Sequence, residues 1–282
     1  MRLAPGERAA LGALGESITP RLTDAQRKLI LASSVIRPEL KAKHETGPQI
    51  PAECVYFTAA SFCSPLLAGG AQTPRYSEWM SQVDRRLEYR FHRRWLKLLQ
   101  WLQPGRRWLL KGPAHLRTVD ILLEVYPDAM IVQTHRDPLR VVPSLASLAG
   151  TINDVYYQTP IDGASFMVTA GEAFSAALEE VVTLRSDEAV DRRFSDVRDS
   201  EWIDTPLETF AALHCRLSAS VAPSARLLAA VADYLAQLRR GKCGLHRCGA
   251  LCLSEERQLQ SACAAYREEF DIARERDGTP SA

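Results

Sequence analysis

The chain has 282 residues, 46% of them hydrophobic and 24% charged, and its 35 Lys and Arg residues nearly balance its 34 Asp and Glu residues. This length supports a large core, and the balance of charge excludes a protein that is basic overall and adapted to nucleic acid or anionic membrane. Charge interrupts the amino-terminal stretch at Glu7 and Arg8, and no apolar run reaches about 18 residues. We therefore expect a soluble, cytoplasmic protein without a transmembrane segment, in which any anion site is local.

The first hundred residues predict helices. Residues 1–40 read as helical, and residues 77–102 predict one long amphipathic helix, because apolar residues recur there every three or four positions. The expected buried face consists of Trp79, Val83, Leu87, Phe91, Trp95, Leu98 and Leu102. The basic face of the same helix, with five arginines between positions 85 and 94, most simply faces water.

Residues 107–148 predict a core unit of strand, helix, strand and helix. The runs WLLK (108–111) and AMIVQTH (129–135) are short and apolar, as is typical of buried parallel strands. Helices are expected over 115–127 and, after Asp137 and Pro138, to about residue 148. The two strands should be parallel neighbours joined by a right-handed crossover.

The remaining sequence predicts helices around a third strand at 193–197. The expected helices cover residues 172–190, 205–217, 223–240 and 255–273. Without repeats or a linker, the simplest organisation is a single domain over residues 1–282, mostly helical and built on a small parallel sheet.

Lys111 and Arg136 each stand at the carboxyl end of a predicted strand. Ligands of open parallel sheets bind at these ends, where the following helix N-terminus favours an anion. Ser144, two turns after Arg136, can add a hydroxyl donor. Each residue alone has an ordinary alternative. Lys111 could be exposed to solvent, Arg136 could pair with Asp137 or Asp128, and Ser144 could simply pack. Together they predict a phosphate or sulfate site.

The cysteines of the carboxyl-terminal part do not form a familiar metal motif. Cys243, His246, Cys248 and Cys252 give the pattern C-x2-H-x-C-x3-C, which differs from paired zinc knuckles. Cysteine is often a small buried apolar residue, so we favour packing over zinc and expect no metal.

The sequence LLKGPAHL (109–116) with YPDAMIVQTHRDPLRVVPSLASL (126–148) resembles the central signature of the PAPS-dependent sulfotransferases, in the bacterial-type group with LKxPxHL and THRDP motifs. PAPS is 3′-phosphoadenosine 5′-phosphosulfate. Less specific similarity covers most of residues 40–272. The resemblance implies an α/β, P-loop-NTPase-like three-layer fold with a small parallel sheet and many helices. It also implies transfer of a sulfuryl group from PAPS to a hydroxyl or amine of a small-molecule, lipid or sugar acceptor.

The same resemblance implies which residues bind the nucleotide. Arg136 and Ser144 match the two positions that hold the 3′-phosphate. Arg239, Arg240 and Gly241 resemble part of a loop that closes over that phosphate, and a glycine-hinged loop with several cations suits such a contact.

Two further positions resemble the catalytic ones of the family. Lys111 matches the lysine near the transferred sulfuryl group, where it would offset developing charge without a metal. His115 lies close to the catalytic histidine of many relatives, but a capping role in its helix is an equal alternative. His44 and Glu53 are reserve candidates for the base.

The sequence departs from the family at its beginning. The family's opening strand and its G-x-P-R-S-G-T-T loop, which grips the 5′-phosphosulfate, have no counterpart here. A truncated gene model, a degenerate relative and a split protein all remain open, the first two being favoured. The alternative function is therefore a catalytically inactive or truncated sulfotransferase-like nucleotide-binding protein. A nucleotide kinase ranks last, because its G-x4-G-K-[ST] loop is also absent.

Overall fold

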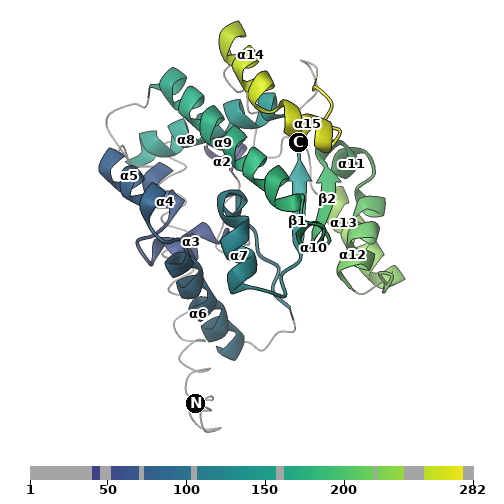
Figure 1. Ribbon diagram of the computed structural model, residues 1–282. Helices are drawn as coiled ribbons and strands as arrows, with labels where there is room; N and C mark the ends of the chain where they lie inside the picture. Colours follow the sequence, from purple (N-terminus) through teal and green to yellow (C-terminus); the bar gives the residue numbers. More distant parts are fainter. Residues whose placement is uncertain are drawn as a thin grey trace. The chain divides into compact units, whose positions relative to one another are not determined.

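The computed structural model describes residues 40–44, 52–69, 73–102, 107–156, 162–218, 221–237 and 251–275 (Figure 1). The chain divides into two compact units: residues 1–125 with 148–161, called unit 1, and residues 126–147 with 162–282, called unit 2. A single domain over residues 1–282 stays a prediction. The region before residue 40, including the expected amino-terminal helices, lies outside the described residues.

The regular elements in the described part of unit 1 are all helices. Its helices are α2 (Leu40–Lys43), α3 (Val55–Ala59), α4 (Pro65–Gly69), α5 (Pro74–Gln82), α6 (Arg86–Leu102), the 3-10 helix η1 (Pro113–Thr118) and α7 (Val119–Val125). Helix α6 packs against α3 and α7, and the ring of Phe57 on α3 meets those of His92 and Trp95 at centroid distances of 5.8 and 6.1 Å. The core of unit 1 thus lies beside α6.

The long helix predicted over 77–102 is two helices, α5 and α6, so that prediction is wrong (Figure 1). Val83 is extended, and the Asp84 carboxylate accepts a hydrogen bond of 3.0 Å from the Arg86 N–H to start α6. The break changes the helical register. As a result Trp79, Leu87 and Leu98 of the expected buried face are 45%, 54% and 44% exposed. The buried face of α6 consists instead of Glu88, Tyr89, His92 and Leu96.

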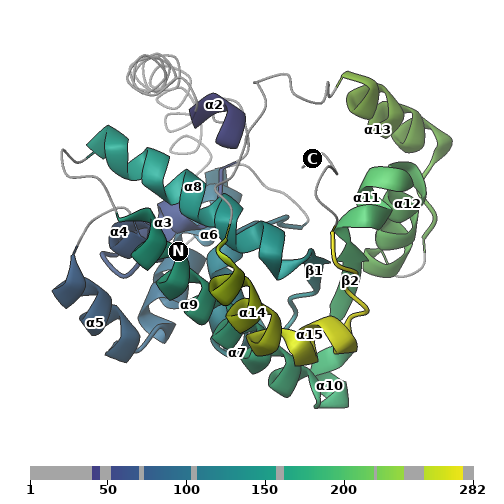
Figure 2. The same cartoon turned by 90° about the horizontal axis from the view of Figure 1, so that it is seen from above.

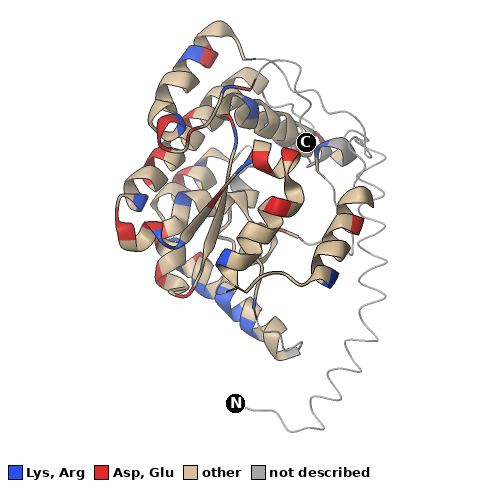
Figure 3. Ribbon diagram, turned by 90° about the vertical axis from the view of Figure 1, so that its right-hand side faces the viewer, with Lys and Arg blue, Asp and Glu red and all other residues tan. Residues whose placement is uncertain are grey.

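The basic residues at the start of α6 and along it differ in their surroundings. Blue bands mark the Lys and Arg residues on this helix in Figure 3. Arg85 is half-buried and pairs with Glu88, and Arg86 pairs with Glu124. The others lie exposed on the helix surface, as expected of a solvated face; they are Arg90, Arg93, Arg94 and Lys97. None of the described helices combines the length and apolar character needed to cross a bilayer.

Unit 2 contains a parallel sheet of two strands in its described residues. Strand β1 (Ile131–His135) pairs with β2 (Phe194–Arg198), in a register that runs from Ile131 opposite Phe194 to His135 opposite Arg198. Both strands were predicted from the sequence to within two residues. The mostly helical α/β fold with a small parallel sheet is thereby confirmed.

Helices surround this sheet. They are α8 (Pro138–Tyr156, whose last residues belong to unit 1), α9 (Gly163–Arg185), α10 (Glu188–Asp191), α11 (Asp199–Asp204), α12 (Pro206–Leu217), α13 (Ala225–Gln237), α14 (Leu253–Ala262) and α15 (Ala264–Glu269). Helices α14 and α15 pack on α9, and α11 and α12 pack by β2. The two strands lie between these groups (Figures 1 and 2).

The strand predicted at 108–111 is absent, so the predicted strand-helix-strand-helix unit is wrong in its first element. Residues 107–112 form neither a helix nor a strand and pair with no strand among the described residues, and Leu109 is 93% exposed. The Lys111 carbonyl accepts a hydrogen bond of 2.8 Å from the Cys54 N–H, just before α3. An apolar run becomes a strand only beside a partner strand, and the described residues supply none here.

Arg185, at the end of α9, joins this helix to the sheet. Its guanidinium donates to both Asp196 carboxylate oxygens at 2.7 Å, and it also bonds Asp191 at 2.7 Å and Gln133 at 3.0 Å. The Arg185 guanidinium carbon lies 4.4 Å from the ring centroid of Phe194. Burial opposes ionisation of Asp196, but the bonds from Arg185 and His135 prevail and hold the pKa of Asp196 below its ordinary value.

Replacement of Arg185 by Met should therefore destabilise the protein by roughly 2 kcal/mol or more, since it leaves Asp196 without its forked partner. The matched control is Arg192→Met. Arg192 pairs with Glu188 while its side chain is 65% exposed, so its loss should cost less than about 0.5 kcal/mol. Urea unfolding measures both. Equal effects of the two substitutions would contradict this role of Arg185.

Candidate functional site

Lys111 is held by a carboxylate in unit 1. It lies between α6 and η1, and its ammonium pairs with Glu53, whose side chain is 17% exposed. The His44 Nε2 atom lies 3.6 Å from the same carboxylate. The structure thus brings together one predicted catalytic residue and both reserve candidates for the base.

These contacts change the chemistry of Glu53. The hydrogen bond with His44 lowers its pKa, burial opposes this, and the bond with Lys111 lowers it further, to about 2. Glu53 is therefore ionised at neutral pH and is a weak proton acceptor. Its evident effect is to orient Lys111, whose side chain remains 67% exposed.

His115 is bound to the neighbouring helix. It lies in η1, and its Nδ1 atom is 2.7 Å from the hydroxyl oxygen of Tyr89 on α6. The Tyr89 hydroxyl is in turn 2.7 Å from Thr118 Oγ1. The residue at the N-terminal cap of η1 is Gly112, so the His115 side chain bonds α6 and does not cap its own helix.

Burial keeps His115 neutral. Desolvation, with a smaller repulsion from His92, lowers the pKa of His115 to about 4. Burial also lowers the pKa of His92 to about 4, and the two rings meet edge to face at a centroid distance of 6.4 Å. At pH 7 the imidazole of His115 is therefore a neutral group that can accept a proton.

Arg136 occupies the carboxyl end of β1 in unit 2, as predicted. Its guanidinium forks onto the Glu275 carboxylate, with Nε at 2.9 Å and Nη2 at 3.1 Å, and Nε is 3.3 Å from Asp199. The expected alternative partners were Asp137 and Asp128. Asp137 instead caps α8 by accepting from the Leu139 N–H, and it also accepts from the Glu275 N–H at 2.9 Å.

This arrangement places a carboxylate of the chain at the end of β1. The Glu275 carboxylate lies on Arg136 next to the start of α8, with Arg140 Nε 4.0 Å away. Burial raises the pKa of Asp199 although Arg136 opposes this, so a second negative charge is less favourable there. The carboxylate geometry is the one in which arginine also binds phosphate.

The other predicted binding residues have different outcomes. Ser144 is half-buried, two turns into α8 and in unit 2 with the start of that helix. Arg239, Arg240 and Gly241 lie outside the described residues, as do Cys243, His246 and Cys248. Lys111 and Arg136 belong to different units. Within the described ranges, no group of three or more His, Cys, Asp or Glu residues is arranged to hold a metal ion.

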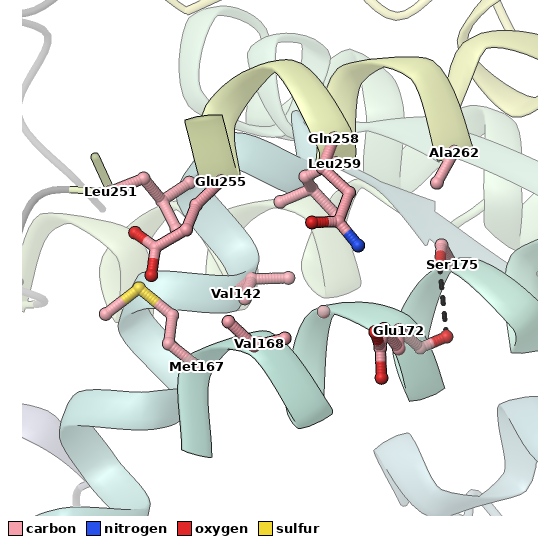
Figure 4. Close-up of a pocket in the computed structure, with 11 residues that line it drawn as sticks. Val142, Met167, Val168, Glu172, Ser175, Leu251, Glu255, Gln258, Leu259 and Ala262 are labelled. Carbon is pink, nitrogen blue, oxygen red and sulfur yellow. Dashed lines mark hydrogen bonds between the residues drawn. The ribbon is translucent and has the colours of Figure 1, made fainter. Parts of the chain in front are cut away.

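A shallow groove between α9 and α14 contains none of the predicted site residues (Figure 4). It is lined mainly by apolar side chains such as Met167, Val168 and Leu259. The dashed line in Figure 4 is the 3.0 Å hydrogen bond from the Ser175 hydroxyl to the Glu172 carbonyl, which lies within α9. The groove is a seam of helix packing.

Sequence reasoning missed Tyr89, Thr118, Asp199 and Glu275. Glu275 follows no motif, and its contact with Arg136 spans 139 positions. Asp199 had a usable signal, because it lies two residues after the predicted strand 193–197 and parallel strands end at one edge. Tyr89 also had a usable signal, because it lies three positions before His92 and the two residues therefore share a helix face.

Comparison with known proteins shows the family of the chain. The model of the Sulfotransferase family matches residues 11–217, and the chain belongs to this family. The crystal structure of sulfotransferase STF9 from Mycobacterium avium has a similar fold, with a TM-score of 0.76 and 25% sequence identity. The match covers 90% of this chain but only 64% of that protein. No curated protein matches the chain.

The two buried histidines predict a loss of stability in acid. Their pKa of about 4 in the folded protein lies below the ordinary 6.5, so the unfolded chain binds more protons between these values. Their full contribution to stability is present above pH 6.5 and is lost as pH falls towards 4, by up to roughly 3 kcal/mol per ring.

The free energy of unfolding, measured by urea titration between pH 7 and pH 4, checks this. His92→Gln should reduce the pH dependence, whereas His214→Gln on α12, outside this cluster, should leave it unchanged. An identical pH dependence in wild type and His92→Gln would contradict the prediction.

Proposed function

We propose that this chain is a sulfotransferase that takes PAPS as donor and an acceptor with a hydroxyl or amine. The acceptor would be a small molecule, a lipid or a sugar. The observation that carries the proposal is the forked contact of Arg136 with a carboxylate at the end of β1. Family membership supports the reaction class, and the cytoplasmic location remains a prediction.

The residues present fit the 3′-phosphate of such a donor. Arg136 already holds an anion through two parallel hydrogen bonds, and a phosphate offers the same pair of oxygens. Ser144 would add a hydroxyl, and Arg239, Arg240 and Gly241 would close over the phosphate. The Glu275 carboxylate would have to leave, since two anions do not share one guanidinium favourably.

Lys111 and His115 are the proposed catalytic residues. The donor supplies the sulfuryl group, which passes to the acceptor while the bond from sulfur to the bridging oxygen breaks. Lys111, oriented by Glu53, would stabilise the negative charge that develops on the departing oxygen. His115, neutral at pH 7, would take the proton from the acceptor. Glu53 is the weaker candidate, because Lys111 and His44 occupy its carboxylate.

Substitution at the end of β1 should change nucleotide affinity in opposite directions. Arg136→Ala should weaken binding of 3′,5′-adenosine diphosphate roughly 10- to 100-fold, through loss of a charge-assisted fork. Glu275→Gln should strengthen it several-fold, because a competing charge is removed. Isothermal titration measures both, with exposed Glu188→Gln as the control for Glu275. Unchanged affinity in Arg136→Ala would contradict the proposed site.

A transfer assay distinguishes an enzyme from a nucleotide-binding relative. The chain is incubated with sulfur-35-labelled PAPS and a panel of phenols, sugars, lipids and amines, and labelled products are counted. Turnover that falls by about 100-fold or more in Lys111→Ala supports the enzyme. Nucleotide binding without any turnover supports instead the catalytically inactive or truncated sulfotransferase-like protein.

A further inference from the structure

Three hydrogen bonds form a closed circuit around His115. The first joins its Nδ1 atom to the Tyr89 hydroxyl at 2.7 Å, and the second joins that hydroxyl to Thr118 Oγ1 at 2.7 Å. The third runs from Thr118 Oγ1 to the His115 carbonyl oxygen at 3.5 Å. The circuit therefore begins and ends on one residue, and its members come from α6 and η1.

The direction of these bonds follows from counting protons. A carbonyl only accepts, so Thr118 donates its single proton to it and meets Tyr89 with a lone pair. Tyr89 then donates to Thr118, and its oxygen accepts from Nδ1–H of His115. The reverse direction satisfies only two of the three contacts.

Burial preserves this direction. Tyr89 is 1% exposed and Thr118 is 3% exposed, so bulk water does not compete for their hydroxyl groups. Burial also raises the pKa of Tyr89 above its ordinary value, so the phenol retains its proton at any pH at which the protein would act. The circuit thus contains a fixed number of protons.

The Nε2 atom of His115 lies beside Gly112, which has no side chain to cover it. A Cβ atom on Gly112 would lie 3.1 Å from both Nε2 and Cδ2 of His115, closer than side chains normally pack. The absence of a side chain at this position leaves the Nε2 edge of the ring uncovered on that side. Nε2 is thus the nitrogen that can meet another molecule.

We propose that Tyr89 and Thr118 are positioning residues that hold neutral His115 as its Nδ1–H tautomer and present the lone pair of Nε2 as the proton acceptor. This inference rests on the proposed function for its catalytic meaning. A base must offer a lone pair to the acceptor's proton, and in a neutral imidazole only the nitrogen without hydrogen can do so. The buried circuit would select that nitrogen before any substrate binds.

Nitrogen-15 NMR of the full chain labelled at histidine tests the proposal without requiring turnover. Ring correlation spectra at pH 7 distinguish protonated from unprotonated nitrogens, and His115→Asn identifies the signals of His115. We expect a protonated Nδ1 and an unprotonated Nε2 in the wild type. A protonated Nε2, or two averaged signals, would overturn the inference.

Variants of the circuit add a matched test. Tyr89→Phe and Thr118→Val should move the His115 proton to Nε2, whereas Thr118→Ser retains the hydroxyl and should keep the wild-type tautomer. Retention of Nδ1–H in Tyr89→Phe would also overturn the proposal. A protein that shows the expected tautomers but transfers no sulfuryl group would contradict the proposed function alone.

In an active preparation, the same variants supply a kinetic readout. Tyr89→Phe and Thr118→Val should lower kcat by about 10-fold to 100-fold, with KM for the donor unchanged, and Thr118→Ser should recover most of the rate. An unchanged kcat in both Tyr89→Phe and Thr118→Val would contradict the positioning role.

Discussion

The parallel pairing of β1 with β2 determines the chemistry of unit 2. Because His135 lies opposite Arg198, the residues that follow the two strands, Arg136 and Asp199, emerge at one edge and approach to 3.3 Å. The carboxyl-terminal segment crosses the same edge, where Glu275 binds Arg136 through its carboxylate and Asp137 through its N–H. Arg136, at the end of β1 and beside the N-terminus of α8, is thus already paired with the Glu275 carboxylate.

The Glu275 carboxylate, which is already paired with Arg136, would affect how tightly the proposed site binds a phosphate. A phosphate that replaces Glu275 gains the fork of Arg136 but must break an existing ion pair, so the net affinity is smaller than a vacant guanidinium would provide. The same contact ties residue 275 to the sheet, although 139 positions separate it from Arg136. In the proposed site, nucleotide binding would therefore be coupled to the position of the carboxyl-terminal segment through Arg136.

In unit 1, buried polar groups position the predicted catalytic residue His115. Tyr89 and His92 are buried on α6, where sequence periodicity predicted a stripe of larger apolar residues. The burial of His115 itself keeps its ring neutral, and its Nδ1 atom lies 2.7 Å from the Tyr89 hydroxyl. In the same unit, Glu53 orients Lys111. The two predicted catalytic residues thus have different supports, a buried hydroxyl pair and an exposed ion pair.

The sequence predicted the two strands that pair with each other, but it was a poor guide to features that depend on a partner distant in sequence. Strands were predicted at 129–135 and 193–197, and β1 and β2 lie at 131–135 and 194–198, although Val132 and Asp196 are exposed. The run at 108–111 has the same composition, yet no strand among the described residues lies beside it. The predicted buried face of the helix over 77–102 was wrong, because the extended residue Val83 divides that helix and changes the register of its second part. The position of Arg136 at a strand end was predictable from the sequence. Its pairing with Glu275 was not, because a contact between residues distant in sequence leaves no local pattern.

The most direct test of the account is a crystal structure of the full chain with 3′,5′-adenosine diphosphate. We predict that the 3′-phosphate lies on the guanidinium of Arg136, within hydrogen-bond distance of Ser144, and that the Glu275 carboxylate has moved away. A nucleotide bound elsewhere, with the Arg136–Glu275 pair intact, would contradict the assignment of the end of β1 as the donor site.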